Sequence, residues 1–307
     1  MKVSIFGETG FVGEYIINEL INANIKPYAL VRYGNSNKIL NKEKTNIITG
    51  DLSNPTAIEQ TIMNTEAVIY NVGIIREFKS SGISFENLHY QSLKKVVDIA
   101  KKLNVKRFIL MSANGVKQSG TSYQTTKYRA EQFLKESGLD WTIFRPSLIF
   151  GDSDDKQEFC KQLKKDMLSL PFPAPLFHKG LLPFNAGLFK MSPIHVKDVA
   201  QIFVKSLFMK NTIGKVYELG GETKTWKEII NEISKASGKN KLCIPAPVLP
   251  IRILAFIFDR FSWFPISRDQ LTMLLEGNIC ESSNEFNLFD IKPIPFNQEN
   301  LKYLNDE

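Results

Sequence analysis

Residues Gly7-Glu8-Thr9-Gly10-Phe11-Val12-Gly13 carry glycines at intervals of three, close to the start of a 307-residue chain. The short apolar run 2–6 before them predicts a buried strand, and the helical spacing of apolar residues over 11–23 predicts a helix after them. A strand, a glycine-rich turn and a helix in this order are the context in which such glycines bind a dinucleotide. A structural turn without a ligand is the alternative interpretation.

Each glycine has a separate physical reason. Gly7 permits the tight turn, Gly10 lets the backbone approach a diphosphate, and Gly13 lets helix and strand pack closely. The start of the helix then offers free N–H groups and a partial positive charge to the phosphates.

The chain up to about residue 150 alternates between strand-like and helical segments. Further strands are expected at 26–31, 46–49, 66–70, 107–111 and 140–144, and further helices at 55–63, 88–103 and 123–136. Short apolar strands separated by helices predict an α/β fold with a doubly wound parallel Rossmann sheet. After residue 151 this regular alternation ends, and the apolar, proline-containing stretch 171–193 predicts an irregular loop region.

Two domains are expected. Residues 1–150 form the dinucleotide-binding Rossmann domain, to which 194–221 returns with a helix at 196–208 and a strand at 215–219. Residues 151–193 and 222–307 form a smaller C-terminal substrate or partner lobe, with helices at 226–237 and 248–263 and a less regular tail from 270 onward.

Composition excludes several classes. The net charge of +7 is spread without a long basic run, so no nucleic-acid partner is expected. Cys160, Cys243 and Cys280 are far apart, which predicts neither a disulfide framework nor a metal site. The N-terminus lacks a leader's apolar segment, and the apolar run 253–258 is far shorter than the ~20 residues of a membrane-spanning helix. A cytoplasmic protein without a transmembrane segment is expected.

Arg32 follows the second predicted strand, where a carboxylate would select NAD and an arginine would receive the 2′-phosphate of NADP. No acidic residue follows until Glu43, so NADP(H) is favoured over NAD(H). A solvated surface arginine is the alternative interpretation. Asp51 and Leu52 follow the third strand, toward the adenine. Asn71, Val72 and Gly73 follow the fourth, toward the ribose and nicotinamide.

Tyr123 and Lys127 lie one helical turn apart, and Ser112 follows the fifth strand. A nearby ammonium lowers the pKa of a phenol toward the range of a general acid, and Ser112 could hold a substrate carbonyl. Tyr90 and Lys94 have the same spacing on a more distant helix, so the spacing alone is weak. Lys127 could also bind the ribose hydroxyls without any chemistry.

Several motifs in order resemble the extended short-chain dehydrogenase/reductase superfamily, which includes the NAD-dependent epimerases and dehydratases. They are Gly7 to Gly13, Asp51-Leu52, Ser112, Tyr123-x-x-x-Lys127, Arg145-Pro146-Ser147 with Phe150-Gly151, and Ile194 to Ala200. A narrower resemblance, through Ser112 to Gly115, Val216 to Gly221 and Ile266 to Asn278, is to the atypical branch typified by the nucleotide-binding accessory subunit of respiratory complex I.

The resemblance implies a bound NADP(H) with a structural role. It implies contacts from Gly7, Thr9, Gly10, Phe11, Val12, Gly13, Arg32, Asp51, Leu52, Asn71, Val72, Gly73, Lys127 and Pro146. The chain departs from the accessory subunit by keeping Tyr123 and Lys127 with Ser112 upstream. It departs from the extended enzymes by carrying His89 where they usually have asparagine.

Three functions remain open. The first is an accessory or assembly factor of a complex I-like membrane respiratory complex, peripheral at the inner face of the membrane, with structural NADPH. The second is an NADPH-dependent oxidoreductase or epimerase that acts on a small lipophilic carbonyl through Tyr123 and Lys127. The third is a redox sensor. The apolar helix expected at 248–263 would contact the membrane-complex partner or the lipophilic substrate, or else serve as a core or lid helix.

Overall fold

The computed structural model describes residues 1–39, 41–78, 82–180, 182–259, 261, 264 and 266–305. The chain divides into two compact units. Unit 1 comprises Met1–Pro146, Val196–Glu218 and Glu285–Ile291, and unit 2 comprises Ser147–His195, Leu219–Asn284 and Lys292–Glu307.

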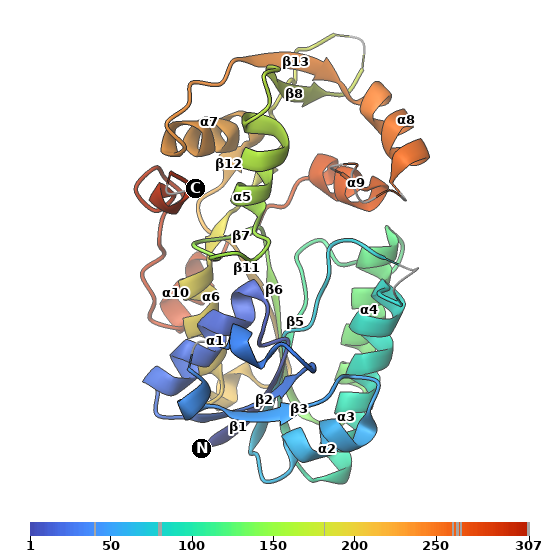
Figure 1. Ribbon diagram of the computed structural model, residues 1–307, viewed down its shortest axis with the longest axis vertical. Helices are drawn as coiled ribbons and strands as arrows, with labels where there is room; N and C mark the ends of the chain where they lie inside the picture. Colours follow the sequence, from blue (N-terminus) through green and yellow to red (C-terminus); the bar gives the residue numbers. More distant parts are fainter. Residues whose placement is uncertain are drawn as a thin grey trace. The chain divides into compact units, whose positions relative to one another are not determined.

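Unit 1 is built on a seven-stranded sheet in the order β11-β6-β5-β4-β1-β2-β3 (Figure 1). Its strands are β1 (Lys2–Phe6), β2 (Lys26–Val31), β3 (Asn46–Thr49), β4 (Ala67–Tyr70), β5 (Arg107–Met111), β6 (Asp140–Pro146) and β11 (Lys215–Leu219). The pairings from β3 through β6 are all parallel. The order reverses at β1, which places the carboxyl ends of β1 and β4 at a topological switch point, the usual ligand edge of such sheets. The predicted Rossmann sheet is therefore confirmed.

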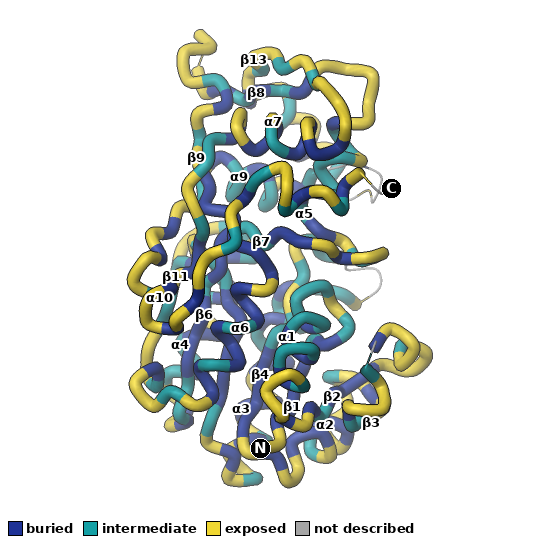
Figure 2. The backbone as a smooth tube through the Cα atoms, turned by 90° about the vertical axis from the view of Figure 1, so that its left-hand side faces the viewer, coloured by how far each residue is buried: buried dark blue, intermediate teal, exposed yellow. Residues whose placement is uncertain are grey.

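Helices cover both faces of this sheet. They are α1 (Phe11–Asn22) and α6 (Val196–Ser206) on one face, and α2 (Pro55–Ile62), α3 (Ser92–Lys102) and α4 (Ser122–Lys135) on the other (Figure 1). The short helix α10 (Ser283–Leu288) also belongs largely to this unit. Because helices cover both faces, the central strands β1, β4 and β5 are almost entirely buried. All four residues of β4 are buried, and Figure 2 shows the buried tube along the central strands.

The helix predicted over 88–103 is present, but its first part is a π-helix rather than an α-helix. A π-helical turn, η4 (Glu86–Gln91), runs directly into α3. The wider turn carries His89, which is buried. Such π-turns concentrate at functional sites because they redirect a side chain without ending the helix.

Unit 2 has short strands and several helices. They are β7 (Ile149–Phe150), α5 (Phe159–Leu163), η5 (Lys164–Leu168), β8 (Ala174–His178), β9 (Lys190–Met191), β10 (Ile194–His195), β12 (Lys224–Thr225), α7 (Trp226–Ala236), β13 (Cys243–Pro247), α8 (Val248–Phe258) and α9 (Arg268–Glu276). Its main core surrounds Trp226, whose indole donates to the carbonyl oxygen of Pro175 at 3.0 Å.

Part of 171–193 is more regular than the sequence suggested. Strand β8 pairs in parallel with β13 over five residues. Ala174, Leu176 and His178 are buried, and the residues between them are half-buried, which is the alternation of a strand. The prolines of both strands obscured this pattern, because a two-stranded sheet consists only of edges, where proline is tolerated.

The helix expected at 248–263 was too long. Helix α8 ends at Phe258, and the N–H groups of Phe261 and Phe264 bond to carbonyls three residues earlier, not four. The rings of Phe258 and Phe264 lie 6.0 Å apart in the α8–α9 cluster, so tertiary packing of aromatic residues turns the chain. Arg260, Ser262 and Trp263 lie outside the described residues. In the part of the chain that is described, no helix has both the length and the apolar character needed to span a bilayer.

Candidate functional site

The glycine loop of residues 7–13 lies at the carboxyl end of β1, against the backbone that follows β4. Gly7 has φ +94°, and a Cβ there would approach the carbonyl oxygen of Asn71 to 2.7 Å. A Cβ on Gly13 would lie 2.2 Å from the carbonyl oxygen of Gly7. Both positions therefore require glycine, for the turn and for close packing of α1 against β1.

Gly10 has a different role. It is the N-cap residue of α1 and provides no side-chain cap to the first turn of the helix. A Cβ on Gly10 would meet only the carbonyl oxygen of Gly7, at 3.4 Å, so folding alone does not require glycine there. The first turn, which includes Phe11, Val12 and Gly13, therefore leaves N–H groups uncapped, and uncapped groups of this kind at a helix N-terminus are suited to bind an anion such as a diphosphate. Thr9 and Phe11 flank this surface, half-buried.

Glu8 is the unexpected residue of the loop. Only 4% of its surface is exposed, and its Oε2 atom has no hydrogen-bond partner within the described residues. Burial raises the pKa of Glu8 to about 7, although backbone N–H groups of the loop and the nearby Arg32 act in the opposite direction. A buried carboxylic acid therefore lies inside the loop.

Arg32 directly follows β2 and is exposed. Its positive charge lowers the pKa of both Glu8 and Asp51, so the structure brings these three residues near one another, as their positions after β1, β2 and β3 predict. Asp51 itself accepts hydrogen bonds from Ser53, at 2.7 Å from the backbone nitrogen and 2.5 Å from the hydroxyl. These bonds are the main reason that the pKa of Asp51 lies below its usual range. Leu52 packs against the core of unit 1.

The next wall of the candidate site is the segment after β4, which consists of Asn71, Val72 and Gly73. The side chain of Asn71 donates to the carbonyl oxygen of Gly7 at 3.4 Å, which ties this segment to the glycine loop. His89 supports the segment from the other side, because its Nε2 accepts from the backbone nitrogen of Ile74 at 3.2 Å.

His89 is held as a neutral ring. With Nε2 accepting, Nδ1 carries the proton and donates to Thr126 Oγ1 at 3.2 Å. Burial is the main cause that moves the pKa of His89 far below its usual range, and the ammonium of Lys127 adds to it. His89 thus positions the loop after β4.

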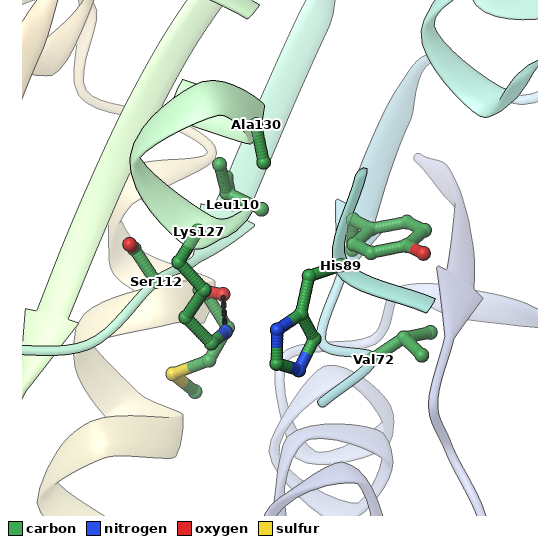
Figure 3. Close-up of a pocket in the computed structure, with 8 residues that line it drawn as sticks. Val72, His89, Leu110, Ser112, Lys127 and Ala130 are labelled. Atoms are coloured by element: carbon green, nitrogen blue, oxygen red, sulfur yellow. Dashed lines mark hydrogen bonds between the residues drawn. The ribbon is translucent and has the colours of Figure 1, made fainter. Parts of the chain in front are cut away.

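Lys127 is buried, and its Nζ donates to the carbonyl oxygen of Met111 at 3.2 Å. A Cβ on Gly73 would lie 3.6 Å from the same Nζ, so this wall passes beside the ammonium. Figure 3 shows the amine of Lys127 and the ring of His89 pointing toward one another. Burial lowers the pKa of Lys127 to about 8, although Glu131 opposes the shift.

Ser112 is held by a partner that the sequence analysis did not identify. Its hydroxyl donates to Glu131 Oε1 at 2.5 Å, and Glu131 is fully buried. Arg145 donates to both oxygens of the same carboxylate, at 2.9 and 2.7 Å. Glu131 lies four residues after Lys127 and eight after Tyr123, so the helical repeat that linked those two residues could have identified it. Pro146, buried at the end of β6, accepts from the Asn114 nitrogen at 2.9 Å.

Tyr123 lies on the same face of α4, among aromatic rings. The rings of His89 and Phe85 meet it edge to face, at centroid distances of 5.2 and 5.6 Å. Lys127 Nζ lies 5.7 Å from the Tyr123 ring centroid. Burial raises the pKa of Tyr123 above its usual range, which is opposite to the direction expected from a neighbouring lysine.

The space beside these residues is small. A cavity of about 10 Å³ lies between Lys127, Ser112 and His89 (Figure 3), which is room for a single water molecule. Tyr70, Val72, Leu110, Met111 and Ala130 complete its lining.

The residues present fit a dinucleotide. The N-terminus of α1 is uncapped, the backbone at Gly10 is open, and Arg32, Gly73 and Lys127 lie at the carboxyl ends of the strands or beside them. When bound, a nicotinamide dinucleotide would supply hydride chemistry. Within the described residues no group of three His, Cys, Asp or Glu side chains could hold a metal ion.

The sequence of the chain is similar to those of several known proteins. A family model described as NAD(P)H-binding matches residues 7–167. The mitochondrial NADH-ubiquinone oxidoreductase 40 kDa subunit of Neurospora crassa is 26% identical over 98% of this chain and 78% of that protein. The photosystem II assembly factor Ycf39 of Cyanophora paradoxa is 24% identical over 86% of the chain and 77% of that protein.

Enzymes are also similar to the chain. The ceramide reductase of Caulobacter vibrioides is 24% identical over 85% of this chain and 78% of that protein. Among solved structures, the UDP-glucuronic acid 4-epimerase of Bacillus cereus in complex with UDP-glucuronic acid and NAD has a TM-score of 0.72 at 18% identity, and the match covers 100% of this chain and 98% of that one. That likeness supports the fold.

Proposed function

Because the chain belongs to the NAD(P)H-binding family, we propose that it is an accessory or assembly protein of a complex I-like membrane respiratory complex, with NADP(H) as a structural cofactor. In this proposal unit 1 binds the nucleotide, and unit 2 contacts the partner protein of the membrane complex. The phosphates are assigned to the N-terminus of α1, and the ribose hydroxyls near the nicotinamide to Lys127.

The structural role of the nucleotide rests on one observation above all. The groups expected to move a proton are engaged within the protein, since Ser112 donates to the buried Glu131 and Tyr123 is packed against His89 and Phe85. A phenol whose pKa is raised by burial is a poor general acid near neutral pH. The glycine loop, which would hold the phosphates, has its three glycines and the uncapped N-terminus of α1.

The choice of NADP(H) rests on Arg32. Its guanidinium is exposed at the end of β2, where a planar fork of N–H groups suits a phosphate. The association with a membrane complex is supported by the respiratory subunit and the photosystem assembly factor that the chain resembles. It is also supported by α8, which exposes Leu249, Ile253 and Phe256 by 67%, 52% and 68%. Peripheral attachment at the inner face of the membrane follows from this proposal.

The experiment is mass spectrometry of the nucleotide released from purified protein, together with its rate of exchange against added NADH. The proposal predicts NADP(H) that exchanges slowly, and respiratory-complex subunits that co-purify with the chain. Arg32→Ala should shift the released nucleotide toward NAD(H), whereas Lys38→Ala, a matched exposed cation farther along, should not. Release of NAD(H) alone, with rapid exchange, contradicts the proposal.

A second candidate is an NADPH-dependent reductase of a lipophilic carbonyl compound. It is favoured by Lys127 Nζ at 5.7 Å from the Tyr123 ring and by the similar ceramide reductase. In this case NADPH is consumed with a long-chain carbonyl substrate, and Tyr123→Phe abolishes the turnover while nucleotide binding persists. An activity that survives Tyr123→Phe rejects the catalytic assignment.

A further inference from the structure

Unit 2 contains a second cavity, of about 250 Å³, which the proposed function does not use. Strand β8 contributes Phe177 and His178, and the segment after it contributes Lys179, Asn185, Leu188 and Phe189. Helix α9 closes it with Leu275. This volume is far larger than the single-water space beside Lys127 and leaves room for a headgroup and several carbons.

The segment after β8 is folded into a defined wall. The backbone nitrogen of Gly187 donates to the Phe177 carbonyl oxygen at 2.9 Å, and that of Leu188 to the Asn185 carbonyl oxygen at 3.2 Å. Gly187 has φ +70°, and a Cβ there would lie 3.0 Å from Leu176 Cδ2. The segment therefore lies directly on β8.

The polar lining favours an anion. Among the described residues that line the cavity none is acidic, and Lys179 makes no ion pair within the described part of the chain. His178 is only 7% exposed, and its buried Nδ1 has no hydrogen-bond partner among the described residues. Buried nitrogen atoms normally have a hydrogen-bond partner, so the unpaired Nδ1 of His178 indicates a site for a ligand group beside it. Asn185 adds an amide donor.

The rest of the lining is apolar and continues onto the surface. Phe189 stacks on Trp226 with centroids 5.3 Å apart, and Phe177 packs on the cluster of α8 and α9. The lining residue Leu188 is 53% exposed, and Leu182 and Phe184 beyond the cavity are 61% and 86% exposed. Figure 2 shows exposed tube around β8 and β13. An apolar surface of this kind next to a cationic pocket suits a chain with a charged end.

We propose that this cavity binds an anionic amphiphile, beyond and independently of the nucleotide role. The carboxylate or phosphate head pairs with Lys179, Asn185 and His178. The first part of the alkyl chain packs on Phe177, Phe189 and Leu275, and the remainder lies over Leu188 and its exposed neighbours.

The test is titration of decanoate and of decyl phosphate into the full-length protein, followed by calorimetry and by tryptophan fluorescence, since Trp226 stacks on a lining residue. Saturable binding is expected for both probes, with decanol weaker. Lys179→Glu should weaken binding of both anions about tenfold, the usual effect of losing one charged hydrogen bond. Leu188→Asp should weaken them similarly. Lys235→Glu, a charge reversal on the exposed face of α7, is the matched control and should bind as the wild type does.

Vesicles distinguish the two sources of the ligand. Binding to phosphatidylglycerol vesicles but not to phosphatidylcholine vesicles, lost in Lys179→Glu, identifies a lipid headgroup. Binding of free decanoate without vesicle binding identifies a soluble amphiphile. The proposal is overturned if decanoate binds without saturation, or equally to wild type and Lys179→Glu while circular dichroism shows both folded. A Gly10→Val variant should still bind decanoate, so failure of the nucleotide proposal would leave this result intact.

Discussion

Replacement of Glu8 by glutamine tests the buried carboxyl inside the glycine loop. The pKa of Glu8 rises from 4.5 to about 7, mainly through burial. Each unit corresponds to about 1.4 kcal/mol, so ionising Glu8 in the folded protein costs about 3 kcal/mol. Glutamine keeps the size of the side chain and cannot ionise.

The sign follows from linkage. The folded state holds the proton of Glu8 more tightly than the unfolded state, so the stabilisation is fully present below pH 4.5 and is lost as the pH rises to about 7. The wild type should therefore lie within about 1 kcal/mol of Glu8→Gln in stability at pH 5. By pH 8 it should be less stable than the variant by about 3 kcal/mol.

The assay is urea unfolding from pH 5 to pH 8, followed by circular dichroism. Glu158 in unit 2, whose pKa burial also raises to about 7, contributes equally to both proteins and cancels in the difference. Glu43→Gln, at an exposed position, is the control and should leave the curve unchanged. If wild type and Glu8→Gln give parallel stability curves over this range, the inference that burial raises the pKa of Glu8 is wrong.

Three further predictions concern the site. Gly13→Ala should destabilise the fold by about 1–3 kcal/mol, because the new Cβ meets the Gly7 carbonyl oxygen. Gly10→Ala should retain wild-type stability and lose nucleotide affinity, so equal melting temperatures for the two variants would contradict the packing argument. Ser112→Ala should cost about 1–3 kcal/mol, through the hydrogen bond lost by the buried Glu131, yet leave nucleotide affinity unchanged in calorimetry; a stable variant that no longer binds would instead place Ser112 at the ligand. Nucleotide affinity should fall as the pH rises past about 8, where Lys127 loses its charge. Lys127→Met should bind the nucleotide weakly at every pH, and a pH-dependent fall that persists in this variant would exclude Lys127 as its source.

The Rossmann sheet could be predicted because its signals are local. Within the strand–loop–helix unit, glycine is required at Gly7 by its positive φ and at Gly13 by its close approach to the Gly7 carbonyl oxygen, and β4 is a continuous apolar run. The positions of Arg32, Asp51 and Asn71 after successive strands follow from the same topology. In the structure Arg32 lies close enough to Asp51 to lower its pKa, and Asn71 contacts Gly7.

The partners of the site residues could not be predicted as well. Ser112 was identified from its position after β5, but its hydrogen bond depends on Glu131 from α4 and on Arg145 from β6. Glu8 looks like an ordinary loop residue until the fold shows that it is buried. The ring packing of the half-buried Tyr123 likewise depends on His89, which lies on the π-turn η4.

Unit 2 was the least predictable part. The pairing of β8 with β13 joins segments far apart in the chain, and prolines mask both strands. The end of α8 at Phe258 depends on ring packing with Phe264. Helix α9 did carry a local signal, since Ser267 and Gln270 form a capping box, and this signal was missed.

The central claim is that the N-terminus of α1 holds the diphosphate of a nicotinamide dinucleotide. Calorimetric titration of NADPH into protein stripped of nucleotide measures this directly, with Gly10→Val as the comparison. Wild-type protein should bind one NADPH per chain with a dissociation constant on the order of micromolar or tighter, and folded Gly10→Val should not bind it. Wild-type protein that binds neither NADPH nor NADH, or a Gly10→Val variant that binds as tightly as the wild type, would contradict the account.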